Sequence, residues 1–584
     1  MSSYRLDWQC LLPHTKQYSL LFKQAESVQS THFIDLQRRL ATTLQLFCQP
    51  RHPAKLLLIK GQEDRRYLSL IAEAVTAYQP PITGVLGSRY EIQGSQVTCH
   101  AATQAEDNFA AKTHCIAEEW AEQATLFGSL CGSPGHYQLQ PGLVHQVNGG
   151  TLILSLRVLF DQPWLWPRLK QILLSGQFQW YPADETRPLP LAIPPMPLDL
   201  RLILVGDDLS LLDFGDLEAH SDLFAIYSEI EPELSVTNAE ELKPWIGYVN
   251  GIMAKNQLAP LQSSAWPCLL QAAVRKTEDH QRLPLCPFWI ENLLVESMLM
   301  SPDPSLGAEI LQNSLQIRRW RESYLPELVQ RDIHHGQLRI ETEGSAIGQL
   351  NGLSVVVYPG HTLACGEPSR ISCVVHSGDG DITDVERKTE LGGNIHAKGM
   401  LIMQAYLVSE LALEQPLPFA ASLVFEQSYG EVDGDSASLA GLCTLVSALA
   451  QQPLSQQIAV TGAVDQFGRV QAVGGLNEKI EGFFAICEQR GLTGEQGVIL
   501  PATNKLQLCL SDPVVQAVRK SRFHLWVVDH VADALPLLTG IPFKQESGCS
   551  LIGLINERIA QLTAMQDRQR IPFLLRWLTW FTHR

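Results

Sequence analysis

The chain has 584 residues, of which 45% are hydrophobic and 18% charged, and its formal net charge is −17 at pH 7. A single hydrophobic core does not grow to this size, so we expect two to four domains. The acidic balance argues against binding to nucleic acid or an anionic membrane through electrostatic attraction, which needs an excess of Lys and Arg.

The thirteen cysteines are scattered singly and form no C-x-x-C pair, so neither a zinc motif nor a redox motif is indicated. Free thiols in a reducing compartment are expected instead. The first residues lack the basic and apolar segments of a signal peptide, and no apolar run reaches 18 residues. These features favour a cytoplasmic protein without a membrane span.

Residues 1–230 alternate between helical and strand-like segments. Three short apolar runs, "KLLLIKG" (55–61), "TLILSL" (151–156) and "LRLILVG" (200–206), are typical of strands buried on both faces of a parallel sheet. With helices between them, they predict an α/β domain.

Residues 231–336 predict a small helical domain, because strand-like patterns are replaced by amphipathic segments such as "CPFWIENLLVESMLM". Residues 314–335 are expected to form one long helix leading to the next domain. Residues 337–542 then mix strands and helices and predict an α+β domain, with a hairpin at "DQFG" between "IAVTGAV" and "RVQAV". Residues 543–584 predict a helical tail.

Ser436 stands where an acidic turn, Asp433-Gly434-Asp435, runs into a helix of small and apolar residues. Taken alone, this pattern is most simply a helix cap. The alternative is a nucleophile, because the free amides and the positive dipole at a helix start would stabilise an oxyanion.

Lys479 lies 43 residues later, in the first turn of a helix whose buried face is formed by Ile480, Phe483, Phe484 and Cys487. A lysine beside such a face usually extends to solvent. If it is buried near the positive end of the helix, its pKa falls and the neutral amine can act as a general base for a serine.

The segments "LGGNIHAKG", "FEQSYGEVDGDSAS" and "AVTGAVDQFGRVQAVGGLNEKIEGFF" closely resemble the proteolytic domain of Lon proteases, nearest to the LonB-like bacterial branch. The resemblance covers about residues 340–540. It implies a Ser-Lys dyad in which Ser436 is the nucleophile and Lys479 the base, one of the variants of serine-hydrolase chemistry. No G-x-S-x-G elbow surrounds Ser436, so a Ser-His-Asp triad is not indicated.

The same resemblance implies supporting residues. Thr461 matches a threonine that helps to orient the lysine, and Asp433 and Asp435 match acidic positions that gate or stabilise the serine turn. An aspartate close to the lysine would oppose the fall in its pKa, which would hold the free enzyme inactive. His396 and Lys398 match a family motif for which we expect a structural role.

Residues 110–230 resemble the ATPase (AAA+) part of LonB-like proteins, but the residues that bind ATP are missing. After the first strand the chain reads "QEDRRYLSL", without the glycines and the Lys-Ser/Thr pair of a phosphate-binding loop. Ser155 and Leu156 stand where a magnesium-binding Asp-Glu pair is expected. The arginines expected within 221–230 and 285–294 are absent. We therefore expect a degenerate ATPase domain and no bound cofactor or metal.

The resulting hypothesis is a Lon-type serine endopeptidase that acts without ATP or with a partner that supplies the motor. The alternative is a non-catalytic ring-shaped scaffold or regulatory protein. The resemblance implies a ring, six subunits in the family, and substrates that are unfolded or small proteins. The Trp-rich segment "RIPFLLRWLTWFTHR" (570–584) predicts either packing against the chain's own domains or a ring neighbour, or docking to a partner or a membrane surface.

Overall fold

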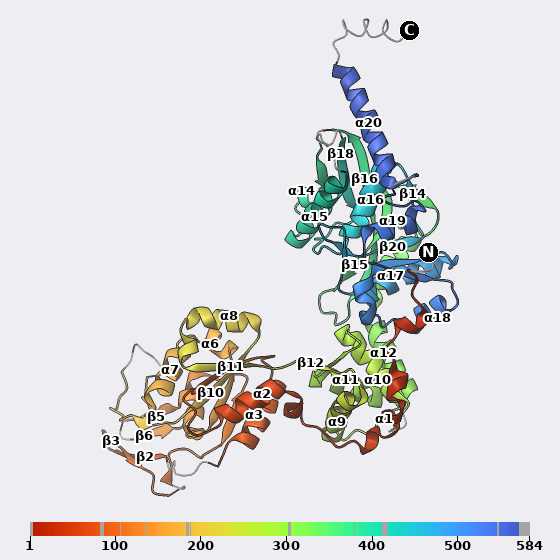
Figure 1. The fold of residues 1–584 in the computed structure, drawn as a ribbon. Helices are drawn as coiled ribbons and strands as arrows, with labels where there is room; N and C mark the ends of the chain where they lie inside the picture. Colours follow the sequence, from red (N-terminus) through yellow and green to blue (C-terminus); the bar gives the residue numbers. More distant parts are fainter. Residues whose placement is uncertain are drawn as a thin grey trace, which may run out of the picture. The chain divides into compact units, whose positions relative to one another are not determined.

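The computed structural model describes residues 4–570 except 82–86, 105–106, 135, 183–185, 187, 302–304, 379, 412–418 and 546–547, and the side chains of 377 and 562–570 are not described. The chain divides into two compact units. Unit 1 comprises Met1–Ser27, Ser235–Lys243 and Ile252–Arg584, and unit 2 comprises Val28–Leu234 and Pro244–Gly251. Figure 1 labels the helices and strands of both units.

Unit 2 is built on a parallel sheet in the order β11-β1-β10-β7-β4. The strands are β1 (Leu56–Lys60), β4 (Cys115–Glu118), β7 (Thr151–Ser155), β10 (Arg201–Gly206) and β11 (Ala225–Glu229). Neighbouring residues of a strand belong to opposite faces: Leu202 and Leu204 join one hydrophobic cluster, whereas Ile203 and Val205 join another. The three predicted parallel strands are therefore confirmed, and burial on both faces explains their unbroken apolar runs.

The helices of unit 2 cover this sheet, and short strand pairs project from it. The helices are α2 (Arg38–Phe47), α3 (Arg65–Tyr78), α4 (Gln123–Phe127), α5 (Leu143–Gln146), α6 (Arg157–Asp161), α7 (Leu165–Ser175) and α8 (Asp208–Leu217). The paired strands are β2 (Ser88–Gln93) with β3 (Gln96–Ala101), β5 (Ser129–Ser133) with β6 (His136–Gln140), and β8 (Gln177–Phe178) with β9 (Met196–Pro197).

A helical region spans residues 239–334. Its elements are α9 (Ala239–Lys255), α10 (Ala265–Thr277), α11 (Pro287–Leu299), α12 (Ala308–Arg321) and α13 (Tyr324–His334), with short strands β12 (Glu233–Ser235) and β13 (Arg282–Pro284) beside them. The single long helix predicted for 314–335 is wrong, because the chain breaks at Glu322–Ser323. Pro326 explains the break: in a continuous helix its ring would clash with the carbonyl of Glu322, whereas the first turn of a new helix accommodates it.

The α+β region of unit 1 is organised by a mixed sheet in the order β17-β18-β16-β15-β20-β23-β24. These strands are β15 (Gln349–Val356), β16 (Cys365–Ser377), β17 (Ile382–Asp384), β18 (Phe419–Glu426), β20 (Ile458–Val460), β23 (Gly497–Pro501) and β24 (His524–Val528). The short pairs are β14 (Ser345–Ile347) with β19 (Pro453–Ser455), and β21 (Ala463–Val464) with β22 (Val470–Gln471). The β21–β22 pair is the predicted hairpin.

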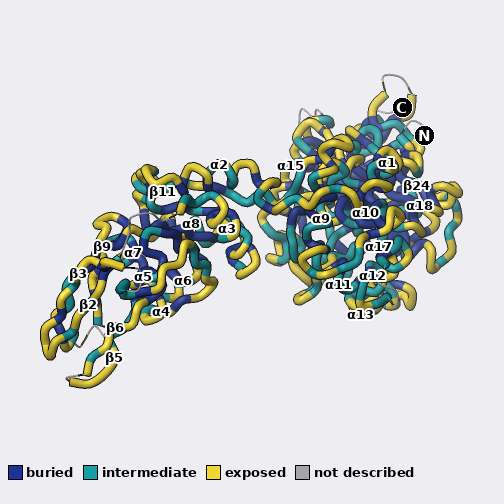
Figure 2. The backbone as a smooth tube through the Cα atoms, turned by 90° about the horizontal axis from the view of Figure 1, so that it is seen from below, coloured by how far each residue is buried: buried dark blue, intermediate teal, exposed yellow. Residues whose placement is uncertain are grey.

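Helices pack on both faces of this mixed sheet. They are α14 (Val385–Lys388), α15 (Asn394–Leu411), α16 (Ser438–Ala450), α17 (Leu476–Arg490), α18 (Asp512–Arg519), α19 (Val531–Thr539) and α20 (Leu551–Arg570). Ile499 of β23 joins the cluster that contains residues of α15 and α16, whereas its neighbours Val498 and Leu500 join the cluster of α17 and α18. The sheet therefore separates the helix that follows Ser436 from the helix that carries Lys479. Figure 2 marks the buried residues in dark blue.

The N-terminal segment differs from the expectation that residues 1–230 form one domain. The amide of Leu6 donates to the carbonyl of Leu525 (2.9 Å), and Leu6 and Leu11 are buried in the same cluster as α17 and α18. This segment includes α1 (Ser19–Lys23) and is grouped with unit 1. A short polar stretch with isolated apolar residues carries no sign of the distant edge strand β24, so the sequence does not predict this pairing.

The end of the chain is only partly described. The tail segment 570–584 falls almost wholly outside the described residues, so the docking prediction for it stays a prediction. Within the described residues, none of the helices combines the length and the apolar character that a membrane span requires.

Candidate active site

Ser436 lies in the turn that leads from β18 into α16. The helix begins at Ser438, two residues after Ser436, and its cap residue is Ala437. The amides of Ser438 and Leu439 donate to the carbonyls of Asp435 (2.9 Å) and Gly462 (3.0 Å). Ser436 is therefore not the cap of this helix, and the cap interpretation of its side chain is wrong.

The backbone of Ser436 is anchored on the residues that follow β20. Its carbonyl accepts hydrogen bonds from the amide of Gly462 (2.8 Å) and from the hydroxyl of Thr461 (3.3 Å). Thr461 is fully buried. The resemblance implied that Thr461 orients the lysine, whereas this hydrogen bond fixes the serine turn. The described side-chain contact of Thr461 is therefore with Ser436 and not with Lys479.

Lys479 is held in the first turn of α17, where it is only 3% exposed. Two glycines allow this helix to approach the sheet closely. A Cβ on Gly366 of β16 would lie 1.9 Å from the carbonyl oxygen of Glu478, and one on Gly482 would lie 2.0 Å from the carbonyl oxygen of Gly366. Any larger residue at either position would push α17 and its lysine away from β16.

The structure brings the two predicted residues into contact. Nζ of Lys479 donates a hydrogen bond to Oγ of Ser436 over 3.0 Å. Burial lowers the pKa of Lys479 from 10.5 to about 8, against the opposing negative charges of Glu278 and Asp435. A substantial fraction of the amine is therefore neutral near pH 8, as a general base must be.

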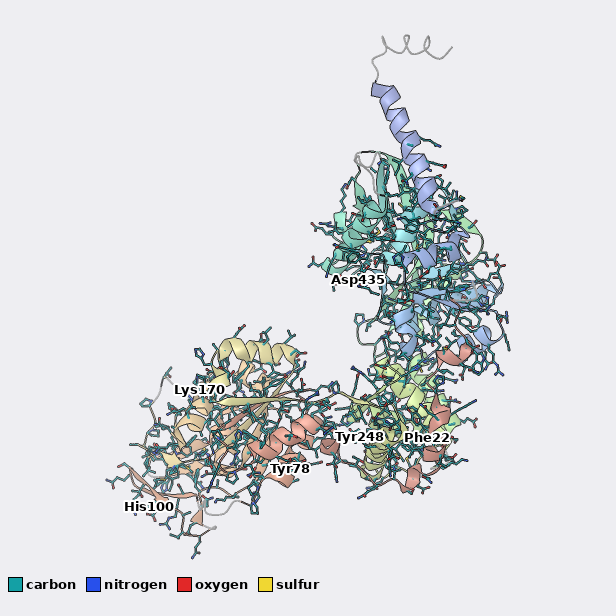
Figure 3. The ribbon with its side chains drawn as sticks, viewed as in Figure 1. Phe22, Tyr78, His100, Lys170, Tyr248 and Asp435 are labelled. Carbon is teal, nitrogen blue, oxygen red and sulfur yellow. The ribbon has the colours of Figure 1, made fainter. Side chains whose placement is uncertain are left out.

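The two aspartates of the turn occupy different positions. Oδ1 of Asp433 accepts from the backbone amides of Ile395 (3.1 Å), His396 (3.3 Å) and Gly434 (2.9 Å), so it joins the serine turn to the start of α15. Asp435, labelled in Figure 3, is exposed and acts on Lys479 through its charge.

The motif residues His396 and Lys398 also lie in different environments, one buried and one exposed. His396 is 1% exposed, and its Nε2 lies 3.1 Å from Oδ2 of Asp384. Lys398 is exposed on α15. Neither belongs to the Ser436–Lys479 pair through a described contact.

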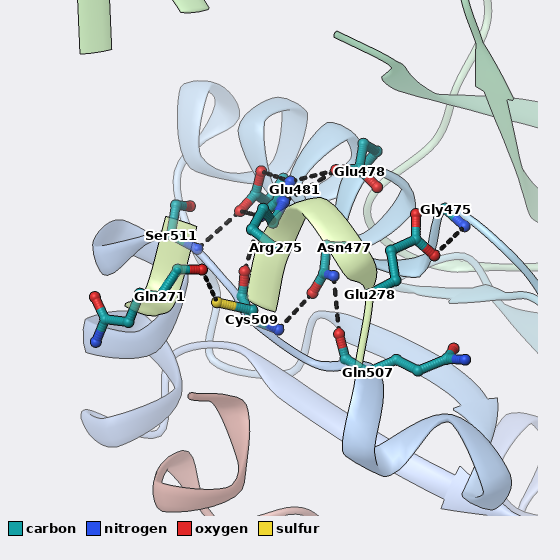
Figure 4. A network of polar contacts seen from close by, with 10 residues as sticks. All are labelled: Gln271, Arg275, Glu278, Gly475, Asn477, Glu478, Glu481, Gln507, Cys509 and Ser511. Carbon is teal, nitrogen blue, oxygen red and sulfur yellow. Dashed lines mark hydrogen bonds and ion pairs between the residues drawn. The ribbon is translucent and has the colours of Figure 1, made fainter. Parts of the chain in front are cut away.

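Sequence reasoning missed a polar network that holds α17 against α10 (Figure 4). The guanidinium of Arg275 bonds to Oε1 of Glu478 (2.6 and 3.0 Å), to both carboxylate oxygens of Glu481 (2.7 and 2.8 Å) and to the carbonyl of Cys509 (2.9 Å). Glu481 also accepts from the amide of Ser511 (2.7 Å). The two glutamates flank Lys479 in sequence, so this clamp fixes the helix turn that carries Lys479.

Glu278 is a second residue that the sequence did not indicate. It follows α10 with a left-handed backbone (φ 52°), and its carboxylate accepts from the amide of Gly475, the residue that precedes α17 (3.2 Å). From there its charge raises the pKa of Lys479, against the larger effect of burial. Because about 200 residues separate Glu278 from Lys479, no local pattern could have linked them.

In unit 2, a buried glutamate joins the segments at the carboxyl ends of three strands. Oε2 of Glu63 accepts from the hydroxyl of Ser155 (2.5 Å) and the amide of Arg157 (3.1 Å). Oε1 accepts from the hydroxyl of Ser210 (2.6 Å) and the amide of Asp207 (3.3 Å). Hydrogen-bond donors at this edge of a parallel sheet commonly bind phosphate. Here they donate to the carboxylate of Glu63 instead.

Backbone amides in the first turn of α3 also donate to an acidic side chain of the protein. The carboxylate of Asp64 accepts from the amides of Arg66 (2.8 Å) and Tyr67 (3.1 Å). In a phosphate-binding loop, such amides and the positive dipole of the helix face the anion. Glu63 and Asp64 are the two acidic residues that the sequence placed in this loop, and their carboxylates bind the groups that would otherwise be available to phosphates.

Comparison with known proteins agrees with this two-part architecture. The family model for the LonB-like AAA domain matches residues 119–231, and the model for the Lon protease (S16) C-terminal proteolytic domain matches residues 429–539. The chain thus combines an AAA-like domain with a Lon-type proteolytic domain. Ser436 and Lys479 both lie within the residues matched by the proteolytic-domain model.

Full-length relatives show the family. A Lon protease homologue of Escherichia coli is 49% identical over 583 residues and 100% of both chains, and one of Haemophilus influenzae is 43% identical over 93% of this chain and 90% of its own. An archaeal Lon protease of Methanocaldococcus jannaschii is 35% identical over 128 residues, 20% of this chain. The chain belongs to the Lon protease family.

Proposed function

We propose that the protein is a serine endopeptidase in which Ser436 is the nucleophile and Lys479 the general base. The observation that carries the proposal is the 3.0 Å contact between Oγ of Ser436 and Nζ of a lysine that is only 3% exposed. A serine hydroxyl is a weak nucleophile until a neutral base accepts its proton. A lysine with a pKa of about 8 provides that base, whereas a solvated lysine does not.

In the first half of the reaction, Oγ of Ser436 attacks the carbonyl carbon of a peptide bond while Nζ of Lys479 takes the hydroxyl proton. The carbonyl oxygen becomes an oxyanion. The protonated lysine then gives its proton to the leaving amine, and the C–N bond breaks to leave an acyl-serine. In the second half, water attacks this ester after losing a proton to Lys479, which returns the proton to Oγ of Ser436.

The oxyanion would be held by backbone amides of the serine turn itself. The amides of Ser438 and Leu439 already donate to backbone carbonyls, so those donors at the helix start are occupied. The amides that precede them in the turn remain the candidates, because they are adjacent to the nucleophile in the chain. Such preorganised donors contribute about 3 kcal/mol to lowering the barrier in serine proteases.

We further propose that cleavage does not require ATP binding by this chain. Glu63 and Asp64 use the hydroxyls and amides at the edge of the unit 2 sheet, and Ser155 stands where a magnesium-binding carboxylate is expected. The helical region would correspond to the lid of this degenerate ATPase domain. Unfolded segments and small proteins that reach the site unaided, or with a partner motor, would be the substrates of a ring-shaped oligomer.

The test is degradation of unfolded casein at pH 8, without ATP, by the full-length protein in its native oligomeric state. The wild type and the control Ser428→Ala, in the same connection before α16, are expected to cleave. Ser436→Ala is expected to lose at least about a thousand-fold in rate, since the acyl step disappears. Equal cleavage by Ser436→Ala would contradict the assignment of the nucleophile, and no cleavage by any assembled form would favour the scaffold alternative.

A further inference from the structure

A second cluster of reactive side chains lies outside the Ser436–Lys479 pair. Asp384 ends β17, Glu386 lies in α14, and His396 lies in the first turn of α15. These elements belong to the same end of the mixed sheet, where α14 packs on β18 and α15 on β17 (Figure 1). One ligand atom from each of the three residues lies within 4.8 Å of the other two.

The three side chains are buried, and several of their polar atoms lack a hydrogen-bond partner among the described residues. The exposed fractions are 7% for Asp384, 3% for Glu386 and 1% for His396. Oε1 of Glu386 accepts from the amide of Phe425 (2.8 Å), which leaves Oε2 as its free oxygen. Although Nε2 of His396 lies 3.1 Å from Oδ2 of Asp384, these atoms, Oδ1 of Asp384 and Oε2 of Glu386 have no hydrogen-bond partner among the described residues.

We propose that Asp384, Glu386 and His396 bind a divalent transition-metal ion, with zinc as the best match. One imidazole and two carboxylates suit zinc, whereas magnesium prefers oxygen ligands and retains its water. Two ligand atoms about 2.1 Å from one zinc ion stand about 3.4 Å apart in a tetrahedron, close to the observed His396–Asp384 separation. The third ligand atom, on Glu386, lies within 4.8 Å of the other two and would have to approach them.

Charge balance supports the proposal. Two carboxylates buried in one cluster repel each other when both are ionised, and each buried polar group without a hydrogen-bond partner is costly. A divalent ion would neutralise both carboxylates and engage one atom of each of the three side chains. The fourth position would be taken by water, since zinc commonly keeps one open position when three protein ligands are present.

The position of this site suggests that the metal braces the serine turn. The backbone amide of His396 donates to Asp433 (3.3 Å), three residues before Ser436, and Gly393 donates to the carbonyl of Val432 (2.9 Å). Metal ligation would tie β17 and α14 to the start of α15, and through Asp433 to the nucleophile turn. It contacts neither Ser436 nor Lys479, so its role is structural.

Metal content and thermal stability of the full-length protein test the site. The protein is stripped with a chelator, loaded with zinc or cobalt, freed of excess ion and analysed by elemental analysis. We expect roughly one ion per chain, a rise in the unfolding temperature on loading, and the visible absorption of a tetrahedral cobalt site. Asp384→Asn and Glu386→Gln are expected to lose the bound ion, and His396→Asn likewise.

Each variant has a matched control at an exposed position of the same residue type: Asp381→Asn just before β17, Glu390→Gln just after α14 and His376→Asn on β16. These three are expected to bind as the wild type does. Absence of stoichiometric binding in the folded wild type would overturn the proposal and favour a metal-free cluster with a proton shared between the carboxyl groups. Equal binding by all three ligand variants would assign the ion to an adventitious surface site and overturn it as well.

Discussion

The amine of Lys479 is subject to two opposing effects. Burial lowers its pKa to about 8, whereas the carboxylates of Glu278 and Asp435 oppose that fall. The balance keeps the lysine partly protonated at neutral pH and partly available as a base. Sequence reasoning anticipated that an aspartate close to Lys479 would oppose the fall in its pKa. It did not anticipate the effect of Glu278, which follows α10 and is remote in the chain.

The pH dependence of cleavage should report this balance. Because the neutral amine is the active form, the rate is expected to rise with pH through about 8. Glu278→Gln removes a charge that raises the pKa of Lys479 while keeping an acceptor for the amide of Gly475, so the rise should move to lower pH. Glu488→Gln, at the exposed far end of α17, is the control and should leave the profile unchanged. An unaltered profile in Glu278→Gln would contradict this role.

The buried lysine should also cost stability. Its fall in pKa from 10.5 to about 8 corresponds to on the order of 3 kcal/mol at pH 7, where the folded state must bury a charge that the unfolded chain solvates. Losing the hydrogen bond to Ser436 costs about 1 kcal/mol. Lys479→Met is therefore expected to raise the free energy of unfolding at pH 7 by about 2 kcal/mol.

The sign of this effect can be checked by pH. The unfolded state binds more protons than the folded state between pH 8 and 10.5, so wild-type stability should rise across that window. The advantage of Lys479→Met should shrink accordingly in urea unfolding curves measured at several pH values. A variant that is less stable than the wild type at pH 7 would refute the assignment of a costly buried amine.

Among the elements, those with a repeated apolar pattern could be predicted and those fixed by distant contacts could not. The strands β1, β7 and β10 were predicted because burial on both faces leaves a continuous apolar run. The helix α17 was predicted from the spacing of Ile480, Phe483 and Cys487. The pairing of residues 5–6 with β24 depends on a partner more than 500 residues away, and no local pattern records it.

The candidate site shows the same limit. The resemblance to a family identified Ser436 and Lys479 before their contact could be seen, because the motifs around them are long. The Arg275 clamp and the Asp384–Glu386–His396 cluster were missed. Each is assembled from single polar residues on different elements, and one Arg or one Asp in a sequence is more often solvated than buried.

The Arg275 clamp predicts how α10 supports the lysine helix. Replacing Arg275 by Met leaves Glu478 and Glu481 partly buried without their cation, which is expected to destabilise this part of unit 1 by about 3 kcal/mol. Activity should fall further than the loss of folded protein explains, because the first turn of α17 becomes free to shift. Lys276→Gln, the exposed neighbour on α10, is the control. Calorimetry and cleavage assays at a temperature where both variants are folded would separate these effects, and equal stability of Arg275→Met and Lys276→Gln would rule the clamp out.

At the scale of the whole molecule, the two units differ in what their polar residues do. In the α+β region the side chains of Ser436 and Lys479 are in contact, whereas in the parallel-sheet unit no phosphate-loop motif follows β1 and Glu63 accepts from the donors at the strand ends. Sequence motifs were sufficient to recognise both families and the missing ATPase residues. The motifs could not show that Glu63 accepts these hydrogen bonds, because the donors, at Ser155 and in the segment 207–210, are distant from Glu63 in the sequence.

Nucleotide binding should therefore be absent. Isothermal titration of the full-length protein with ATP and magnesium, at protein concentrations able to detect a dissociation constant of about 1 mM, is expected to give no heat of binding and no shift in the unfolding temperature. A stable complex with a micromolar dissociation constant would contradict the structural reason given for the loss, and casein cleavage that depends on added ATP would do so independently.

The central claim is that burial makes Lys479 a base for Ser436, and covalent labelling tests it most directly. A fluorophosphonate probe would be reacted with the assembled full-length protein, and the labelled residue identified by peptide mass spectrometry as a function of pH. We predict label on Ser436, at a rate that rises through about pH 8, with none at that residue in Lys479→Met. Labelling of Ser436 at the same rate with and without Lys479, or no labelling of Ser436 in the folded wild type, would contradict the account.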